Sequence, residues 1–302
     1  MSRGAVAGGK RVRRVSATLL ARMPLPAIDE RGDKEERGGA LLVGGSAEVP
    51  GAIVLAGTAA LRAGAGKLKL ATAAAVSAEV GVAVPEALVI GLPQTRDGAF
   101  AADGAARVIA ELDFADALLL GPGMREGRSL VTFVRRVVKA IRVQTLVLDA
   151  AALGVLRRNP QLLHRLEGRA VLTPHAGEMA GMLGVERDEI ARDPLAASLR
   201  AGRLFHAVVM LKGATTFVAT EQGDAFAYEG GDVGLATSGS GDVLAGIVVG
   251  LAAQGADALR SACWGSFLHG AAGKALASRQ ARIGFLAREI AGELPAILQR
   301  LR

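Results

Sequence analysis

The sequence has few aromatic residues and only one cysteine. One Trp, one Tyr and eight Phe are spread over 302 residues, of which 51% are hydrophobic. Ala, Val and Leu must therefore fill the core, which favours close packing of helices on a sheet over an aromatic-rich β-sandwich. The lone Cys263 excludes an internal disulfide and is typical of a reducing compartment. The length allows one large domain or two small ones.

Long apolar runs, a leader and a concentrated basic patch are also absent. The longest apolar run, residues 243–253, is shorter than the ~18 residues that a membrane span needs. The basic N-terminal stretch GGKRVRR has no adjoining apolar segment, so it is no secretory signal. The net charge of +7 comes with Arg residues scattered along the chain and no aromatic residues between them. These absences predict a cytoplasmic protein that binds neither membrane nor nucleic acid.

Short apolar runs alternate with amphipathic segments from residue 40 onward. We expect strands at 40–45, 67–72, 117–123, 145–150, 170–175 and 207–213, and helices at 51–64, 128–141, 151–158 and 188–205. Near-continuous apolar strands separated by helices predict a mostly parallel sheet covered on both faces. Residues 215–231 are expected to form a hairpin that turns at 222–224, and residues 242–302 to be almost all helix.

No linker composition and no internal repeat divides the chain, so one α/β domain is expected. It covers residues 31–302. An N-terminal extension, residues 1–30, precedes it, and a flexible tail is expected over about its first 15 residues.

Unusual residues follow five of the six predicted strands. They are Gly44-Gly45-Ser46, Gly121-Pro122-Gly123, Asp149, Pro174-His175 and Lys212-Gly213. Each has a purely structural explanation, since Gly-Pro-Gly is a common tight turn and a lone His in a loop is usually a surface residue. Ligands of open parallel sheets bind at the carboxyl ends of the strands. Together these residues therefore predict a single crevice.

The segment ATSGSGDVLAG, residues 236–246, places an acid at the start of a predicted helix. Gly239, Ser240 and Gly241 lack bulk, so their backbone N–H groups can approach an anion closely. The helix start adds unpaired N–H groups and the positive end of its dipole. In that field Asp242 is expected to be ionised and ready to accept a proton from a hydroxyl. The alternative is that Asp242 only caps the helix.

Two better-known phosphate motifs are missing. The stretch GAGKLK, residues 64–69, has Leu61 where a P-loop needs its first Gly, and Leu68 after Lys67. No G-x-G-x-x-G lies between the first predicted strand and its helix, which disfavours a dinucleotide-binding Rossmann domain.

Six segments carry a resemblance to a known family. They are, in order, GGSAEVPGAIVLAGTAALRAGAGKL (44–68), GPG (121–123), LDAAAL (148–153), LTPHAGE (172–178), VVMLKGATT (208–216) and SGSGDVLAGIVVGLAAQG (238–255). Together they resemble the ADP-dependent (S)-NAD(P)H-hydrate dehydratase family, and the likeness runs from about Asp33 to Leu298. The resemblance implies a ribokinase-like three-layer fold with a mostly parallel central sheet.

The resemblance also implies a repair reaction on hydrated NADH or NADPH. The hydroxyl is phosphorylated by ADP, or by ATP as the alternative. Phosphate then leaves with the assistance of electrons from the ring. By motif match, Asp242 is the base, and Ala52, Gly123, His175 and Asp242 contact the hydrated substrate. The same match assigns nucleotide binding to Lys212, Gly213, Ala214, Thr215, Thr216 and Gly241. Glu178 would position Mg²⁺ through water, and a first-turn helix acid favoured by the dipole is the alternative.

The chain departs from the family pattern at its start. Many members have a His-Lys-Gly loop before the first strand, and here the corresponding stretch is DKEERGG, residues 33–39, with Lys34 but no His. Many bacterial relatives carry a fused epimerase domain, for which this chain has no room. We therefore expect an epimerase to be a separate protein, and relatives suggest a homotetramer.

Two other functions compete with this interpretation. One is a small-molecule kinase of the same fold that phosphorylates a vitamin or sugar hydroxyl. The other is an inert nucleotide-binding sensor, which predicts a missing base or a broken anion site, and neither is seen in the sequence.

Overall fold

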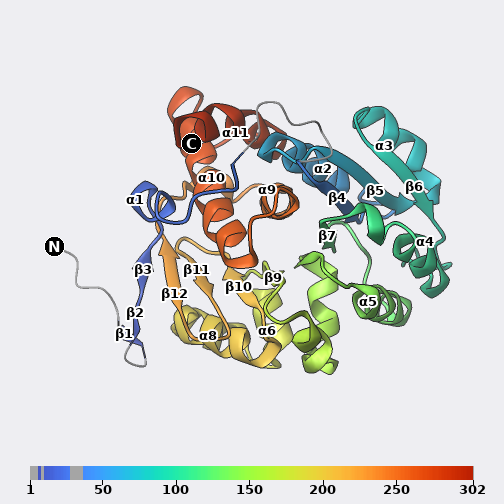
Figure 1. Cartoon of the computed structure of the whole chain (residues 1–302), viewed down its shortest axis with the longest axis horizontal. Coiled ribbons are helices and arrows are strands. Elements are labelled where there is room, and N and C mark those ends of the chain that lie inside the picture. Colours follow the sequence, from blue (N-terminus) through green and yellow to red (C-terminus); the bar gives the residue numbers. More distant parts are fainter. Residues whose placement is uncertain (1–5, 8–9, 28–36, 302) are drawn as a thin grey trace.

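A ten-stranded sheet lies between two layers of helices in the computed structural model, which describes residues 6–7, 10–27 and 37–301 (Figure 1). The strand order is β3-β12-β11-β10-β9-β8-β7-β4-β5-β6. The strands are β3 (Arg13–Arg14), β4 (Gly39–Val43), β5 (Lys67–Ala73), β6 (Leu88–Leu92), β7 (Ala117–Leu120), β8 (Thr145–Leu148), β9 (Ala170–Leu172), β10 (Val208–Leu211), β11 (Thr216–Ala219) and β12 (Ala225–Tyr228).

Seven strands in a row, from β10 to β6, pair in parallel. β11 joins antiparallel to both β10 and β12, as the predicted hairpin requires. β3 pairs in parallel with β12 at the end of the sheet. Two short strands, β1 (Val6–Ala7) and β2 (Lys10–Arg11), form a separate pair.

The central strands are apolar on both sides because helices cover both faces of the sheet. In β7, Ala117 and Leu119 belong to one buried cluster and Leu118 and Leu120 to the other, since successive side chains point to opposite faces. The first cluster is covered by α2 (Gly51–Ala63), α9 (Ser240–Ala253), α10 (Ala258–Arg279) and α11 (Ala287–Leu301). The second is covered by α4 (Ala105–Ile109), α5 (Arg128–Ala140), α6 (Ala176–Leu183) and α8 (Pro194–Phe205), as Figure 1 shows.

Glycines bring α2 and α9 into backbone contact. A Cβ at Gly246 would lie 2.2 Å from the Ala56 carbonyl oxygen, and one at Gly250 would lie 2.5 Å from that of Ala60. A step of four residues along α9 therefore matches a step of four along α2, so the two helices run parallel. Their amino ends lie side by side, at the carboxyl ends of the strands.

All six predicted strands are present, but strand β6 and the helices α3 (Ser77–Ala83), α4 and α6 were not predicted. Two predicted helices also differ from the structure. The segment expected as a helix at 151–158 forms the 3₁₀ helix η4 (Ala150–Arg158), and a second one, η5 (Pro160–Leu166), follows it. The helix expected at 188–205 is divided into α7 (Arg187–Arg192) and α8. Asp193 lies between them with non-helical φ −144° and ψ 79°, because the residue before Pro194 is forced out of the helical region.

The N-terminal segment is more integrated than the predicted tail. Arg13 and Arg14 extend the sheet, Val15 is buried, and the four-residue helix α1 (Ala17–Leu20) buries Leu20. The indole Nε1–H of Trp264 donates to the Met23 carbonyl at 2.7 Å. The boundary at residue 30 stays a prediction, and Lys34 lies outside the described residues.

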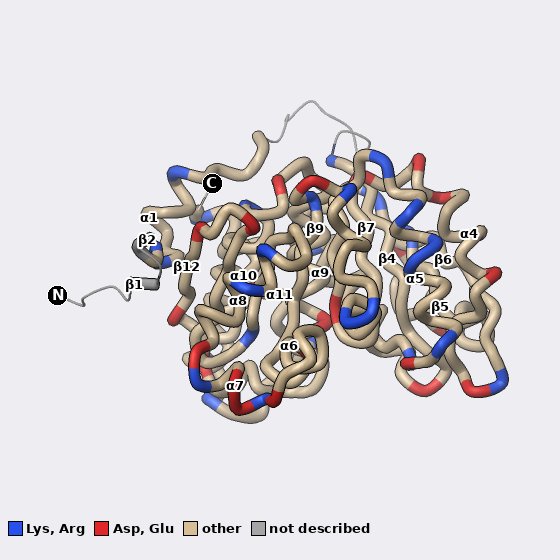
Figure 2. Tube along the Cα trace, turned by 90° about the horizontal axis from the view of Figure 1, so that it is seen from below, with Lys and Arg blue, Asp and Glu red and all other residues tan. Residues whose placement is uncertain are grey.

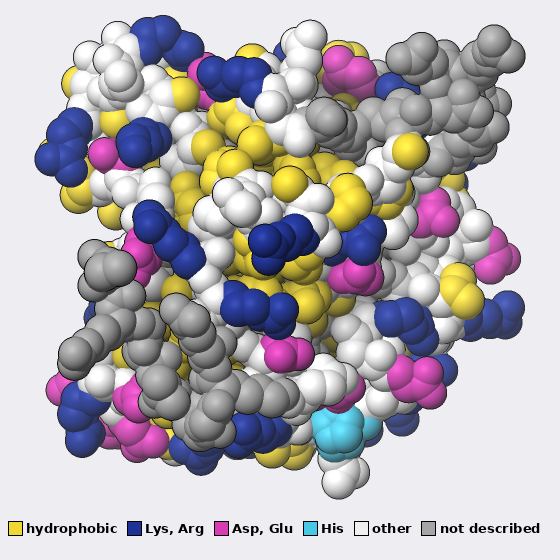
Figure 3. Space-filling view, turned by 60° about the vertical axis from the view of Figure 1, so that its left-hand side comes forward, with side chains coloured by type: hydrophobic (Ala, Val, Ile, Leu, Met, Phe, Trp, Pro, Cys, Tyr) yellow, Lys and Arg dark blue, Asp and Glu magenta, His cyan; other side chains and the backbone are white. Residues whose placement is uncertain are grey.

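In the view of Figure 2, Lys and Arg positions are interspersed with Asp and Glu positions along the chain. On the face that Figure 3 shows, hydrophobic side chains gather near the middle with Lys and Arg around them. Among the described residues, none of the helices is both long and apolar enough to cross a membrane.

Candidate active site

The loops that follow β4, β7, β8, β9 and β10 meet at one edge of the sheet. The N–H of Gly45 donates to the Pro122 carbonyl and that of Ser46 to the Gly123 carbonyl, both at 2.8 Å. At the other end of this row, the Lys212 N–H donates to the Pro174 carbonyl at 2.8 Å. The structure thus brings together the residues that the sequence places at strand ends.

A charged cluster lies where β8, β9 and β10 end. The Lys212 ammonium donates to Asp149 at 2.9 Å and lies 3.8 Å from a carboxylate oxygen of Glu178. Asp149 is buried and also accepts from the Thr173 hydroxyl at 2.7 Å. Burial lowers the pKa of Lys212, but Asp149 and Glu178 more than compensate and the net pKa is raised. Lys212 therefore remains a cation within this cluster.

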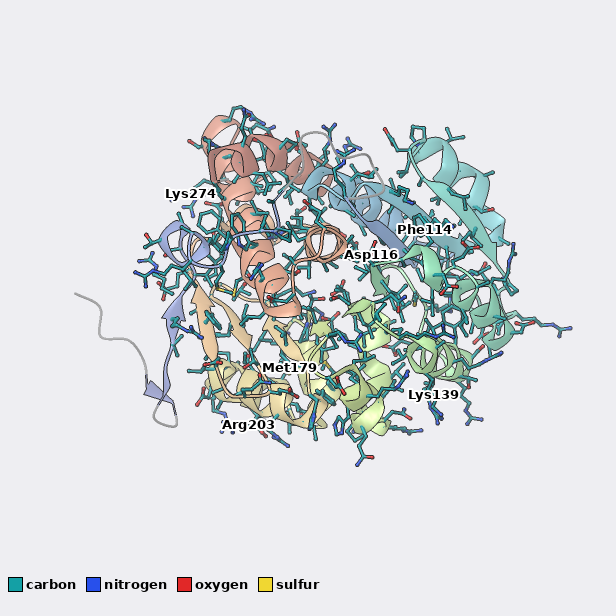
Figure 4. The ribbon with its side chains drawn as sticks, viewed as in Figure 1. Phe114, Asp116, Lys139, Met179, Arg203 and Lys274 are labelled. Atoms are coloured by element: carbon teal, nitrogen blue, oxygen red, sulfur yellow. The ribbon has the colours of Figure 1, made fainter. Side chains whose placement is uncertain are left out.

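His175 and Glu178 form a capping box at the start of α6. The His175 Nδ1 accepts from the N–H groups of Gly177 and Glu178 at 3.0 and 3.1 Å, and Glu178 accepts from the His175 N–H at 2.7 Å. The proton of a neutral His175 ring is therefore on Nε2, and the side chain is exposed. Met179 in the same turn is fully buried and anchors α6 on the sheet (Figure 4).

The amino end of α9 offers two free backbone donors. Gly239 has φ +88° and its carbonyl accepts from the Val243 N–H, while the Ser240 N–H donates to the Thr237 carbonyl. Within the described part of the chain, the N–H groups of Gly241 and Asp242 have no acceptor. These two donors at a helix start suit an anion.

Lys212 faces the same point as these donors. A Cβ at Gly241 would lie 3.3 Å from the Lys212 ammonium nitrogen. Gly241 therefore keeps open the space between the cation and the helix start, and the arrangement has the charge and geometry of a phosphate site.

Asp242 does not act as a helix cap. Gly239 is the N-cap residue, no side chain caps the helix, and Asp242 is the third residue of α9. The capping alternative is therefore wrong.

The pKa of Asp242 is raised to about 7. Burial is the largest cause, Asp149 and Glu178 add to it, and Lys212 opposes it. This differs from the ionised state expected from the helix dipole alone, because burial and two nearby acids outweigh the favourable field. A group with a pKa near 7 can take up and release a proton at neutral pH.

Small residues lie at the same end of the fold as Asp242. Gly123 has φ +64°, and a Cβ there would lie 2.8 Å from the methyl carbon of Ala52. Ala52 stands one turn before Ala56 in α2, as Asp242 stands one turn before Gly246 in α9, so the parallel packing puts both at the same end. A larger side chain at Gly123 would collide with Ala52, so the packing requires small residues at both positions near the acid.

The remaining predicted residues follow β10 directly. Gly213 and Ala214 are exposed, Thr215 is half-buried, and Thr216 begins β11. The sequence interpretation noted Asp149 at a strand end but gave it no role, and the structure makes it the direct partner of Lys212. The sequence feature that could have indicated a role for Asp149 is the position of an acid immediately after an apolar strand.

Among the residues that the structure describes, no three His, Cys, Asp or Glu side chains gather closely enough to hold a metal ion.

Comparison with known proteins identifies the family. The sequence model for NAD(P)H-hydrate dehydratase matches residues 40–296. The chain belongs to the NAD(P)H-hydrate dehydratase family. The ADP-dependent (S)-NAD(P)H-hydrate dehydratase of Xanthomonas campestris is 49% identical over 97% of this chain and 98% of that protein. The bifunctional NAD(P)H-hydrate repair enzyme of Moorella thermoacetica is 37% identical over 96% of the chain, which spans 54% of that longer protein.

One solved structure agrees with this family assignment, and a second agrees with the fold. The ADP/ATP-dependent NAD(P)H-hydrate dehydratase from Bacillus subtilis, co-crystallised with ATP and Mg²⁺, has a TM-score of 0.79 and 27% identity, covering 96% of this chain and 99% of that one. A ribokinase-like superfamily protein from Enterococcus faecalis has a TM-score of 0.83 at 24% identity over 99% of both chains. The family and the ribokinase-like fold predicted from the six segments are confirmed.

Proposed function

We propose that this chain restores NADH or NADPH from its (S)-hydrate while ADP is split into AMP and phosphate. The observation that carries the proposal is Asp242, a carboxyl group with a pKa of about 7 beside the anion site of Gly241 and Lys212. The 49% identity to a dehydratase over nearly the whole of both chains supports this substrate over the vitamin or sugar hydroxyl of a kinase.

In the proposed reaction, Asp242 accepts the proton of the substrate hydroxyl. The hydroxyl oxygen then bonds to the terminal phosphorus of ADP, the bond to the bridging oxygen breaks, and AMP leaves. The carbon–oxygen bond breaks next, and inorganic phosphate leaves as the electron pair of the ring nitrogen stabilises the cation. Loss of a proton from the neighbouring carbon restores the double bond of the dihydronicotinamide.

Different residues of the site would bind the hydrated substrate and the nucleotide. Ala52, Gly123 and the exposed ring of His175, whose Nε2 lies 3.5 Å from Glu178, would contact the hydrated ring near Asp242. Lys212 and the Gly241 N–H would neutralise the nucleotide phosphates, because both face one point at the start of α9. The loop of Gly213, Ala214, Thr215 and Thr216 would hold the rest of the nucleotide.

The donors present fit Mg²⁺ bound together with a nucleotide. Mg²⁺ prefers oxygen ligands and keeps several waters, using one or two carboxylates plus substrate phosphates. Glu178 already accepts from the His175 N–H, so contact through water suits it better than direct ligation. When bound, Mg²⁺ would supply positive charge to the phosphates.

Several finer properties belong to the same proposal. They are a carbon–oxygen lyase class, the use of ATP in place of ADP, a cytoplasmic location, a homotetramer, and an epimerase carried by a separate protein. The shared substrate chemistry of the longer bifunctional repair enzymes supports such a partnership.

Product analysis separates a dehydratase from a kinase. With hydrated NADH, ADP and Mg²⁺, phosphorus NMR should show AMP and inorganic phosphate in equal amounts. Accumulation of a stable phosphorylated product without inorganic phosphate would favour the kinase.

Replacing Lys212 by methionine tests the phosphate contact. We expect Lys212→Met to raise the Kd for ADP by at least about tenfold, since a hydrogen bond to a charged group contributes roughly 1.5–3 kcal/mol. Calorimetric titration at low and high salt would show the loss, and the salt dependence of binding should decrease.

Lys69 provides the matched control. Its side chain is 19% exposed, as is that of Lys212, and its ammonium also pairs with a carboxylate, Glu111, at 2.6 Å. Lys69→Met should bind ADP as the parent does. Normal ADP affinity in Lys212→Met would mean that this lysine only fills space with its methylene chain.

A further inference from the structure

His269 contacts the first turn of α9 from behind. It lies on α10, and its Nε2 is 2.9 Å from the Ser240 hydroxyl oxygen and 3.1 Å from the Ser240 carbonyl oxygen. Ser240 is buried and is followed directly by Gly241 and Asp242, whose free N–H groups form the anion site. The proposed reaction gives His269 no part.

The geometry fixes the proton on the ring. A carbonyl oxygen only accepts, so the contact at 3.1 Å requires that Nε2 carry the hydrogen. The same N–H is shared with the Ser240 hydroxyl oxygen at 2.9 Å. Burial lowers the pKa of His269 to about 4, so the ring is neutral at pH 7 and acts as a fixed donor to both oxygens of one residue.

Glycines make α10 a rigid support for this ring. A Cβ at Gly265 would lie 2.6 Å from a methyl carbon of Val248 in α9. A Cβ at Gly270, next to His269, would lie 2.2 Å from the Tyr228 ring. Because α10 packs this closely against both α9 and β12, His269 has a defined position relative to the start of α9.

We propose that His269 is a positioning residue for the nucleotide, which holds Ser240 so that the N–H groups of Gly241 and Asp242 point at the bound phosphate. The inference rests on the proposed function, because that function puts the nucleotide phosphates at this helix start. Without the donor, the first turn of α9 loses its anchor and the two N–H groups spread over more orientations. Nucleotide affinity then falls, although His269 does not touch the nucleotide.

Two substitutions separate the donor from the packing. His269→Leu keeps an apolar side chain but removes the N–H, and we expect it to raise the Kd for ADP with Mg²⁺ about tenfold, the upper range for one hydrogen bond. His269→Gln keeps an N–H donor at similar reach and should bind within about twofold of the parent. The KM for hydrated NADH should change little in either variant.

His164 is the matched control. Its Nε2 also lies 3.1 Å from a backbone carbonyl, that of Leu204, on the opposite face of the sheet. His164→Leu should leave ADP binding unchanged. A Ser240→Ala variant and the double variant with His269→Leu complete a double-mutant cycle. The double variant should lose less ADP binding free energy than the two single variants lose together, because both substitutions act through Ser240.

Calorimetric titration with ADP and Mg²⁺ decides the question. Weaker binding in His269→Leu, rescue in His269→Gln and a non-additive cycle would support the positioning role. Parent-like affinity in His269→Leu, or additive losses, would overturn it. If His269→Leu fails to fold, the comparison is made between His269→Gln and Ser240→Ala. The positioning role is overturned if His269→Gln binds ADP only as weakly as Ser240→Ala does. A parent protein that binds no ADP would overturn the proposed function itself.

Discussion

Asp242→Asn is expected to lower turnover at least about 100-fold with the fold intact. A positioned general base typically contributes roughly 10²–10⁴-fold, and an amide cannot accept the hydroxyl proton. The exchange keeps the side-chain size, and the start of α9 does not depend on it because no side chain caps this helix. Steady-state turnover of hydrated NADH with saturating ADP, beside the melting temperature, measures both effects.

Asp257 supplies the control for this substitution. It also stands at a helix start, where it caps α10 by accepting from the Arg260 N–H at 2.7 Å. Asp257→Asn should keep parent turnover, since Asn caps about as well as Asp. An Asp242→Asn protein that works within a few-fold of the parent would remove Asp242 from the chemistry.

The pH dependence of turnover and of stability, compared between the parent and Asp242→Asn, gives an independent check. Only the ionised carboxylate accepts a proton, so parent turnover should rise as pH increases through about 7. The folded protein holds the Asp242 proton more tightly than the unfolded chain does, since the Asp pKa is near 3.8 in the unfolded chain and about 7 in the folded protein. The contribution of Asp242 to the free energy of unfolding is therefore lost as pH rises from about 4 through 7. Asp242→Asn should therefore gain in melting temperature relative to the parent above pH 7.

Gly121→Ala is expected to damage both stability and activity. Gly121 has φ +136°, and a Cβ there would lie 1.8 Å from the Asp149 carbonyl oxygen. Backbone strain and forced overlap each cost about 1–3 kcal/mol, so a loss of roughly 2–6 kcal/mol follows. Relief of the overlap must move Asp149, which holds Lys212, so ADP affinity should fall as well.

Gly154→Ala is the matched control for this loss. No atom lies within 4 Å of a Cβ at Gly154, which is in η4 near the same strand end. It should melt and turn over like the parent. Gly121→Ala with parent-like melting temperature and ADP binding would contradict the proposed packing of this loop.

The sheet and the position of the crevice were predictable because they depend on local patterns. Apolar runs predicted six strands, and Asp149 and Lys212 stood at strand ends in the sequence alone. Their ion pair across 63 residues was not predictable, because it requires the order of the strands. The raised pKa of Asp242 likewise depends on burial and on acids from β8 and α6, which no local pattern contains.

The errors have physical causes of the same kind. Pro194 divides a helix whose apolar period continues across it, since the proline excludes the helical conformation at Asp193. Arg13 and Arg14 look like part of a solvated tail, but β12 offers an unpaired edge to them, and Val15 then becomes buried. His269 carried no sequence signal, because its role depends on how closely α10 packs on α9.

Recovery of NADH absorbance from its (S)-hydrate tests the central claim most directly. With the parent protein, ADP and Mg²⁺, absorbance at the wavelength of the dihydronicotinamide should rise, one AMP and one phosphate should appear for each NADH, and omission of the nucleotide should stop the reaction. A folded preparation that binds ADP but restores no NADH from the (S)-hydrate, with either ADP or ATP, would contradict the account.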